Sequence, residues 1–254
     1  MAGSALTPAG CGAVAARWRE LPGEYPLPWR LRALPVCAST ELELEHWLAS
    51  TGQPPLALWA AQQRRGHGQQ GRIWQSPPGG VWLSAALPWP AEPQGTASLA
   101  LAAALGLALQ LEALGLPVQI KWPNDLLVNG RKLAGILPRL RWRGGQVRHA
   151  QVGVGLNGVN RVPAGAINLA EALGQPRHPQ ARPERLTARL LRGLEWTAAA
   201  ARQPELVRRQ AEQRLWQPEW VEYAGERWSV AGLAVDGGLR IHRGAAVAVL
   251  QRGF

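Results

Sequence analysis

The stretch Pro117–Leu137, "PVQIKWPNDLLVNGRKLAGIL", decides how this chain folds. Val118–Lys121 has the composition of a strand, and Trp122-Pro123 interrupts it because proline removes a donor from the hydrogen-bond ladder. Apolar runs then lie on both sides of Asn129-Gly130. Asn-Gly between apolar runs is the strongest short signal of a β-hairpin with a type I′ turn. The stretch therefore predicts a strand followed by a tight hairpin.

The predicted hairpin carries a charged site. A two-residue turn pairs Leu127 with Lys132 and Asp125 with Ala134, so Asp125 and Lys132 lie diagonally on one face, roughly 7–8 Å apart. This separation leaves room for a phosphate or a metal-bound phosphate. A plain surface hairpin is the alternative, but only Lys121 and Lys132 among the 28 basic residues are lysines. A chain that otherwise uses arginine is expected to need a compact ammonium at these positions.

Composition sets the broad class. The 254 residues are 46% apolar and carry a net charge of +11, enough for one substantial core or a core with a small satellite domain. The charge favours anionic partners, although scattered arginines also fit a compositional bias without function. Two cysteines and five dispersed histidines form no zinc or disulfide pattern, so we expect no protein-held metal and a reducing, cytoplasmic location. We expect no signal peptide, and the uncharged stretch Gly95–Leu111 predicts a buried helix rather than a membrane span.

A glycine-rich segment, "RRGHGQQGRIWQSPPGG" at Arg64–Gly80, contains the pattern G-x-G-x-x-G. A dinucleotide-binding loop needs a helix at the third glycine, but Pro77-Pro78 follows Gly71 too closely for one. The P-loop pattern is also absent. The glycines can still bring backbone N–H groups close to an anion. A flexible, exposed loop with basic ends is the alternative.

The rest of the chain mixes helical and strand patterns. Ser39–Ser50 predicts an amphipathic helix, and the apolar runs Pro55–Gln62 and Val81–Leu87 predict buried strands. Two amphipathic helices follow the hairpin region, and short strands alternate with turns from about Trp220. We expect an α+β fold with a mixed sheet flanked by helices. The expected parts are a loosely ordered N-terminal extension (1–33), a central domain (34–217) and a small C-terminal β-barrel (218–254).

Two of these stretches together resemble the biotin protein ligases. That family has a loop of the form G-R-G-R-x-G-R-x-W-x-S-P-x-G, and residues 66–79 read "GHGQQGRIWQSPPG". Its second signature, K-W-P-N-D followed by K-x-x-G-I-L, is present at Lys121–Asp125 and Lys132–Leu137. Ser39-Thr40 and the G-x-G-x-N of Gly153–Asn157 also match, and the order agrees over about residues 36–254.

The resemblance implies a fold, a reaction and partners. The fold is a class II synthetase-like catalytic domain with an SH3-like C-terminal barrel, of the single-function type without an N-terminal DNA-binding domain. The reaction is attack of biotin on the α-phosphate of ATP, assisted by Mg²⁺, to give biotinyl-5′-AMP. A lysine of the acceptor, the biotin carboxyl carrier protein of acetyl-CoA carboxylase, then releases AMP. Neither nucleic acid nor membrane is an expected partner, and a monomer or a homodimer is expected.

The resemblance also implies roles for single residues. Lys132 and Arg72 are the implied catalytic residues, because cationic groups must meet the charge that develops when two anions join. Trp74 serves the nucleotide side with Arg72, and the glycine-rich loop covers the reactive adenylate and excludes water. With Asp125 from the hairpin, the residues expected to bind substrate are Ser39, Thr40, Gln63, Gly66, His67, Gly68, Gln69, Trp74, Asp125, Lys132, Gly135, Leu137, Gly153, Gly155 and Asn157.

This chain departs from the family pattern in its loop and beyond Asn157. His67 and Gln69 stand where the family loop has arginines, and the segment after Asn157, "GVNRVPAGAINLA", has no tryptophan to stack on adenine. Arg64 and Arg65 lie just upstream and can compensate for the lost charge. Two other functions stay open: a lipoate or octanoate ligase or transferase of the same superfamily, and a basic nucleic-acid-binding protein, which the charge and the many tryptophans favour.

Overall fold

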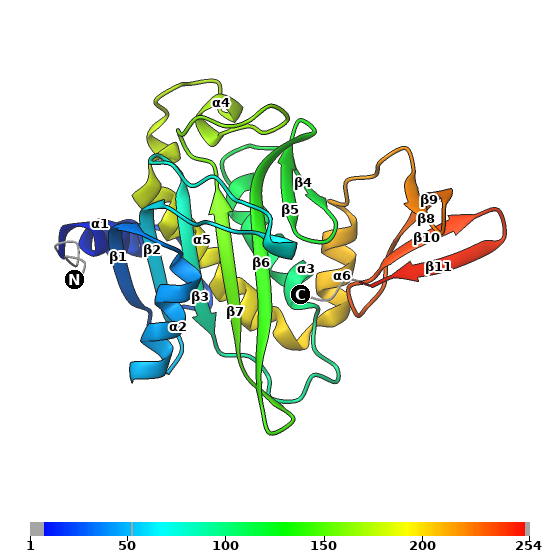
Figure 1. Cartoon of the computed structure of the whole chain (residues 1–254), viewed down its shortest axis with the longest axis horizontal. Coiled ribbons are helices and arrows are strands. Elements are labelled where there is room, and N and C mark those ends of the chain that lie inside the picture. Colours follow the sequence, from blue (N-terminus) through cyan, green and yellow to red (C-terminus); the bar gives the residue numbers. More distant parts are fainter. Residues whose placement is uncertain (1–7, 52, 252–254) are drawn as a thin grey trace.

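The chain forms a seven-stranded mixed sheet with helices on both faces and a separate four-stranded sheet at its C-terminal end (Figure 1). The computed structural model describes residues 8–51 and 53–251. The large sheet has the order β1-β2-β3-β7-β6-β5-β4. The pair β1 and β2 is parallel and the other neighbours are antiparallel. The expected α+β class is confirmed.

The helices and strands have the following bounds. The helices are α1 (Pro8–Glu20), α2 (Thr40–Thr51), α3 (Leu99–Glu112), α4 (Leu169–Ala172), α5 (Pro183–Ala199) and α6 (Pro204–Glu212), with 3₁₀ turns at Gln69–Gly71, Pro179–Ala181 and Ala200–Arg202. The strands of the large sheet are β1 (Arg30–Cys37), β2 (Leu56–Gln63), β3 (Val81–Leu87), β4 (Val118–Lys121), β5 (Asp125–Val128), β6 (Arg131–Arg143) and β7 (Gln146–Leu156). The small sheet contains β8 (Val221–Tyr223), β9 (Glu226–Leu233), β10 (Leu239–Arg243) and β11 (Ala246–Leu250).

The two faces of the large sheet differ in what covers them. Because side chains alternate along a strand, Leu83 of β3 and Val152 and Val154 of β7 join the main core under α3 and α5. The residues next to them along the strands, Ser84 of β3 and Gly153 of β7, lie on the opposite face and line a cavity. On that same opposite face α2 packs over β2 and β3 through a smaller apolar cluster. One sheet therefore has a helix-covered core face and a partly open face.

The hairpin register differs from the prediction after two pairs. Val128 pairs with Arg131 and Leu127 with Lys132, as expected, but Asp125 pairs with Gly135 rather than Ala134. A bulge between Leu126 and Leu127 causes the shift, because an extra residue on β6 then opposes the same length of β5. The predicted gap for a phosphate is wrong: Lys132 Nζ and Asp125 Oδ1 are 2.7 Å apart. The positive φ of Asn129 and Gly130 agrees with a type I′ turn.

The N-terminal segment is more ordered than the sequence suggests. Residues 8–20 form α1, which packs on α5, and Val14 is fully buried. The expectation of loose order is therefore wrong for this part, while residues 1–7 lie outside the described ones. The expected boundary after residue 33 falls inside β1, which begins at Arg30.

A buried ion pair on α5 holds this segment. Glu195 Oε1 accepts hydrogen bonds from Trp18 Nε1, Leu27 N and Trp29 Nε1 at 2.9–3.1 Å, and its Oε2 pairs with Arg192. The three hydrogen-bond donors Trp18, Leu27 and Trp29 each lie more than 160 positions from Glu195 in sequence. The order of the segment thus comes from tertiary contacts rather than from local sequence.

The C-terminal sheet touches the "KWPND" segment. Trp122 Nε1 donates to Gly237 O, in the turn between β9 and β10, at 2.8 Å. Glu212 of α6 also accepts from Leu233 N. The expected small β-structure is present as four antiparallel strands, while the division at residue 217 stays a prediction. Among the described residues, no helix has the length and apolar character needed to cross a bilayer.

Candidate functional site

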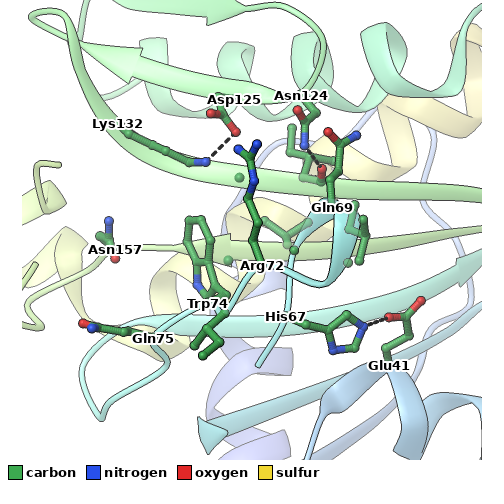
Figure 2. Close-up of a pocket in the computed structure, with 18 of the residues that line it drawn as sticks. Glu41, His67, Gln69, Arg72, Trp74, Gln75, Asn124, Asp125, Lys132 and Asn157 are labelled. Carbon is green, nitrogen blue, oxygen red and sulfur yellow. Dashed lines mark hydrogen bonds and ion pairs between the residues drawn. The ribbon is translucent and has the colours of Figure 1, made fainter. Parts of the chain in front are cut away.

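A cavity of about 530 Å³ opens on the face of the large sheet that also carries α2. This volume lies in the range of small-molecule sites, roughly 300–1,000 Å³. Its walls come from the start of α2, the glycine-rich loop, the "KWPND" segment and the strands β6 and β7. Parts of the chain that are distant in sequence therefore meet around one space (Figure 2).

Glycines make the floor of the cavity, and Trp74 covers part of it. A Cβ atom added at Gly155 would lie 2.5 Å from the Trp74 ring, and one added at Gly135 would lie 2.9 Å from it. Only glycine allows the indole to approach the sheet this closely. Trp74 Nε1 is buried and has no hydrogen-bond partner within the described part of the chain. The ring thus presents an unused donor beside the cavity.

The charged centre of the cavity is Lys132. Its Nζ pairs with Asp125 and lies 4.9 Å from the centre of the Trp74 ring. Its side chain is 35% exposed, so the ammonium can still reach a bound anion. Asn124 Nδ2 donates to Ile136 O at 2.6 Å and fixes the "KWPND" turn against β6. Lys132 is therefore a positioned cation with one carboxylate partner (Figure 2).

The other end of the cavity is a neutral polar network at the start of α2. Gln63 Oε1 accepts from Thr40 N at 2.7 Å and from Thr40 Oγ1 at 3.0 Å. Thr40 Oγ1 also lies 2.8 Å from Ser84 Oγ, and Gln63 Nε2 donates to Ser76 Oγ. Ser39 is 2% exposed and lines the same end. Hydroxyl and amide groups in this arrangement suit a neutral ligand with both donors and acceptors.

The glycine-rich loop folds as a small hairpin of its own. Gly68 N donates to Arg72 O, and Trp74 N donates to Gly66 O. Gln69 Nε2 is buried and has no partner among the described residues. Arg72 is exposed, with a 3.4 Å contact to Gln70 Oε1. The loop therefore brings an unpaired amide and a guanidinium to the cavity.

Every residue expected from the sequence lines the cavity except Gly66. Gly66 is buried behind the loop, where an added Cβ would lie 2.5 Å from Ser76 Oγ. Asn157 lies at the edge and is held by Ile167 O and Asn160. The individual roles remain predictions.

Sequence reasoning missed several lining residues, among them Glu41, Ser84 and Asn124. Asn124 lies inside the "KWPND" motif, so the motif itself was an available signal. Ser84 is the single hydroxyl in the run Val81–Leu87, and such an isolated polar residue in a buried strand is a second signal. Glu41 had no local signal, because its partners come from a distant strand and from the loop.

Comparison with known proteins agrees with this geometry. Residues 34–157 match the family model of the biotin/lipoate A/B protein ligases. The chain is 39% identical over 151 residues to the bifunctional ligase/repressor BirA of Bacillus subtilis, covering 55% of this chain and 46% of that protein. Residues 34–157 thus belong to the biotin/lipoate A/B protein ligase family.

Two further family members extend the comparison. A biotin–[acetyl-CoA-carboxylase] ligase of Paracoccus denitrificans is 39% identical over 115 residues, which are 42% of this chain and 46% of that protein. The chain thus spans under half the length of these curated relatives. A solved biotin protein ligase from Aquifex aeolicus, in complex with biotin and ATP, aligns with a TM-score of 0.70 and 26% identity. That alignment covers 88% of this chain and 96% of the Aquifex chain.

Proposed function

We propose that this chain is an ATP-dependent biotin ligase that forms biotinyl-5′-AMP and transfers biotin to a lysine of an acceptor protein. The observation that carries the proposal is the cavity, which joins a positioned lysine, a glycine floor under Trp74 and a neutral polar end in one space. Likeness to the Aquifex ligase that binds biotin and ATP supports it. The geometry suits a ligand with an apolar body, a neutral polar head and a carboxylate.

The polar groups divide the proposed substrates between the two ends of the cavity. The network of Thr40, Gln63 and Ser84 offers the donors and acceptors that a ureido ring requires. Lys132 lies at the far end, where a carboxylate and a phosphate would meet. Its ammonium stabilises the negative charge that develops as the carboxylate attacks phosphorus. Arg72 and the Gln69 amide are the proposed partners of the ATP phosphates.

The cavity offers a Mg²⁺ ion that arrives with ATP few protein ligands. The described residues contain no cluster of three or more metal-binding side chains. Asp125 and Glu41 line the cavity, but both already pair with cations. Mg²⁺ is commonly bound through one or two carboxylates together with substrate phosphates. Asp125 lies beside Lys132, where the phosphates are proposed to bind, so it is the residue proposed to hold the ion. The ion would neutralise phosphate charge.

The proposed acceptor is a biotin carboxyl carrier protein of acetyl-CoA carboxylase. One relative is a ligase for that carboxylase by name, which supports this choice. Cys11 and Cys37 are free thiols, as expected in the cytoplasm, which is the proposed location. The oligomeric state, monomer or homodimer, stays a prediction.

The proposal is tested by exchange of pyrophosphate into ATP in the presence of each candidate acid, followed by transfer to a purified carrier domain. We expect exchange with biotin and little with lipoate or octanoate, and biotin on the carrier lysine. Exchange with lipoate or octanoate alone would replace the proposal with the other branch of this family. Salt-sensitive DNA binding without any exchange would favour a nucleic-acid-binding protein.

A further inference from the structure

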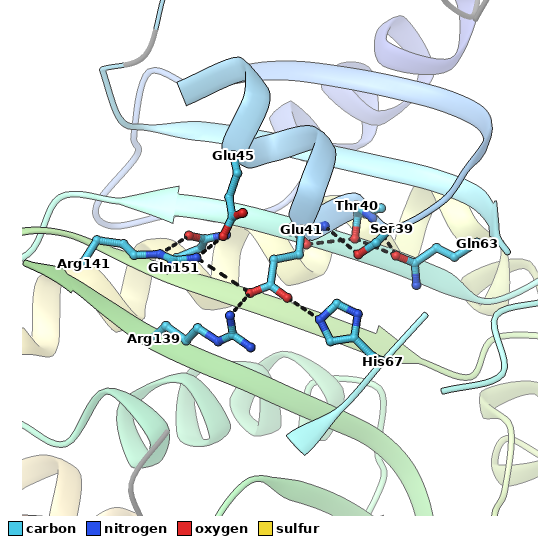
Figure 3. A network of polar contacts seen from close by, with 10 residues as sticks. Ser39, Thr40, Glu41, Glu45, Gln63, His67, Arg139, Arg141 and Gln151 are labelled. Atoms are coloured by element: carbon cyan, nitrogen blue, oxygen red, sulfur yellow. Dashed lines mark hydrogen bonds and ion pairs between the residues drawn. The ribbon is translucent and has the colours of Figure 1, made fainter. Parts of the chain in front are cut away.

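Glu41 joins the helix α2 to the glycine-rich loop and to β6. It follows Ser39 and Thr40 in the first turn of α2 and is 8% exposed. Its Oε1 lies 2.9 Å from Arg139 Nη1, and its Oε2 accepts from His67 Nε2 at 2.7 Å. A single buried carboxylate therefore holds two separate parts of the cavity wall (Figure 3).

Each oxygen of this carboxylate depends on a different partner. A buried carboxylate is costly unless charged or hydrogen-bonding groups surround it. Arg139 belongs to a rigid strand and satisfies Oε1 whatever the loop does. Oε2 pairs with His67, and His67 belongs to the loop. Lifting the loop would take this donor away from the carboxylate.

The loop is held together as one unit because it forms a small hairpin. His67 bridges Ile73, and Trp74 N donates to Gly66 O. The base of the hairpin is held by the bond from Gln63 N to Ser76 O. His67 is the point at which the side of the hairpin is tied to α2. Whatever fixes His67 therefore also fixes Trp74 over the glycine floor.

We propose that Glu41 is a positioning residue that anchors the glycine-rich loop through His67 and so holds Trp74 and Arg72 over the cavity. This inference deepens the proposed ligase function and rests on it for its catalytic consequence. It also explains how a histidine can serve at position 67, because the imidazole donates to Glu41 where the family pattern has arginine. The loop is thus ordered over the cavity before substrate binds.

A neighbouring pair supplies a matched control. Glu45 lies one turn further along α2 and pairs with Arg141 of β6, which also donates to Gln151. Arg141 is 4.0 Å from Glu41, so both acids face the same side of β6. The ion pair of Glu45 is with the strand rather than with the loop. Glu45→Ala therefore removes a similar acid from the same helix face without releasing the hairpin.

The first experiment measures loop release without any substrate. Chymotrypsin cleavage after Trp74 is followed by peptide mass spectrometry in the full chain and its variants. We expect cleavage to be on the order of tenfold faster in Glu41→Ala and in His67→Ala, as fits the loss of one hydrogen bond to a charged group. The cleavage rate of Glu45→Ala should stay within about twofold of the parent rate, because this variant keeps all the loop contacts of the parent. His67→Arg should also stay slow because its guanidinium can donate to Glu41.

Equal cleavage rates in Glu41→Ala and Glu45→Ala would overturn the proposal. If Glu41→Ala fails to fold, His67→Ala compared with His67→Arg decides the same question. A double variant, Glu41→Ala with His67→Ala, should be cleaved no faster than either single variant, since both remove the same contact. Additive acceleration would contradict an anchor made by this pair.

The second experiment uses biotin-dependent pyrophosphate exchange. A released loop must be ordered again on binding, so Glu41→Ala should raise the KM for biotin about tenfold and change kcat much less. His67→Arg should restore the KM that His67→Ala loses. A fall in kcat with an unchanged KM would overturn the positioning role. Absence of exchange in the parent chain would instead reject the ligase function, and the cleavage experiment would still test the anchor.

Discussion

Lys132 combines an ion pair with Asp125 and a position over the face of Trp74. Both contacts suit a compact ammonium that reaches its partners from a flexible stem. The planar guanidinium of arginine is larger and would have to displace Trp74 or Asp125. The rarity of lysine in this chain thus has a geometric reason at this position.

Lys132→Arg tests this reasoning directly. We expect biotin-dependent exchange to fall on the order of 100-fold, in the range measured when one preorganised group that stabilises a developing anion is lost. Arg131→Lys is the matched control at the neighbouring position, because Arg131 pairs with Glu171 and a lysine keeps the charge of that pair. Full exchange activity in Lys132→Arg would contradict the need for an ammonium.

The glycine floor gives a second test at the scale of one atom. Gly155→Ala would place a Cβ 2.5 Å from the Trp74 ring, whereas Gly153→Ala would place one 3.4 Å from Leu137. Overpacking costs about 1–3 kcal/mol, so Gly155→Ala should raise the KM for biotin about tenfold by displacing Trp74. A smaller effect is expected for Gly153→Ala. Equal KM values for both variants would show that Trp74 is not held by the floor.

Most residues that the sequence placed at the site lie inside continuous motifs, although Gly66 does not line the cavity and Asn124 was missed. Lys132, Trp74 and the floor glycines belong to such motifs, and all of them line the cavity. Glu41 was not predictable, because its environment arises only when β6 and the loop come together in the fold. The contact between Lys132 and Asp125 was missed for another reason. The expected separation of roughly 7–8 Å applies to the backbone positions of diagonal neighbours, and the long lysine side chain spans it.

At the scale of elements, α3 and α5 cross at two glycines. A Cβ on Gly106 would lie 2.3 Å from Gly193 O, and one on Gly193 would lie 2.7 Å from Gly106 O. The two backbones are therefore in contact beneath the sheet. Gly106 interrupts an alanine- and leucine-rich helix, and the sequence shows it only as an interruption. The crossing explains why a residue with poor helix propensity occupies this position.

Gly106→Ala should destabilise the chain although alanine favours helices. We expect the free energy of unfolding to fall by about 2 kcal/mol, as for other overpacked cores, measured by urea denaturation. Gly12→Ala in α1 is the control, since no atom lies within 4 Å of its Cβ position. That variant should be neutral or stabilised by up to about 1 kcal/mol. A stabilised Gly106→Ala variant would contradict the close crossing.

The order of elements was predictable where apolar periodicity is strong. The strands Val81–Leu87 and Val118–Lys121 have the expected bounds, and the helices around Ser39–Ser50 and Gly95–Leu111 are present within a few residues. The helix α1 was not predictable, because its sequence has glycines and no clear apolar face. Its order depends on contacts with Arg192 and Glu195, which lie far along the chain.

At the scale of the whole molecule, His149 makes stability depend on pH. Burial first, and then the charges of Arg141 and Arg148, lower the pKa of its imidazole below the usual 6.5. In acid the unfolded chain therefore binds a proton at His149 that the folded chain does not. The contribution of His149 to the free energy of unfolding is fully present above the pKa of the unfolded imidazole, about 6.5. It decreases as the pH falls below that value.

His149→Gln should remove this part of the acid sensitivity. We expect the urea midpoint to fall less between pH 7 and pH 5 in this variant than in the parent, since the proton binding that links pH to unfolding is gone. His46→Gln, at an exposed position of α2, is the control and should follow the parent. An unchanged slope in His149→Gln would mean that other groups dominate the acid response.

The bond from Trp122 to Gly237 joins residues that are 115 positions apart. During synthesis the "KWPND" segment leaves the ribosome long before its C-terminal partner exists. Contacts of such high sequence separation form late, because the loop between them must close first. One wall of the cavity therefore receives its final support only after Gly237 has been translated. A nascent chain can complete the central sheet well before this wall is in place.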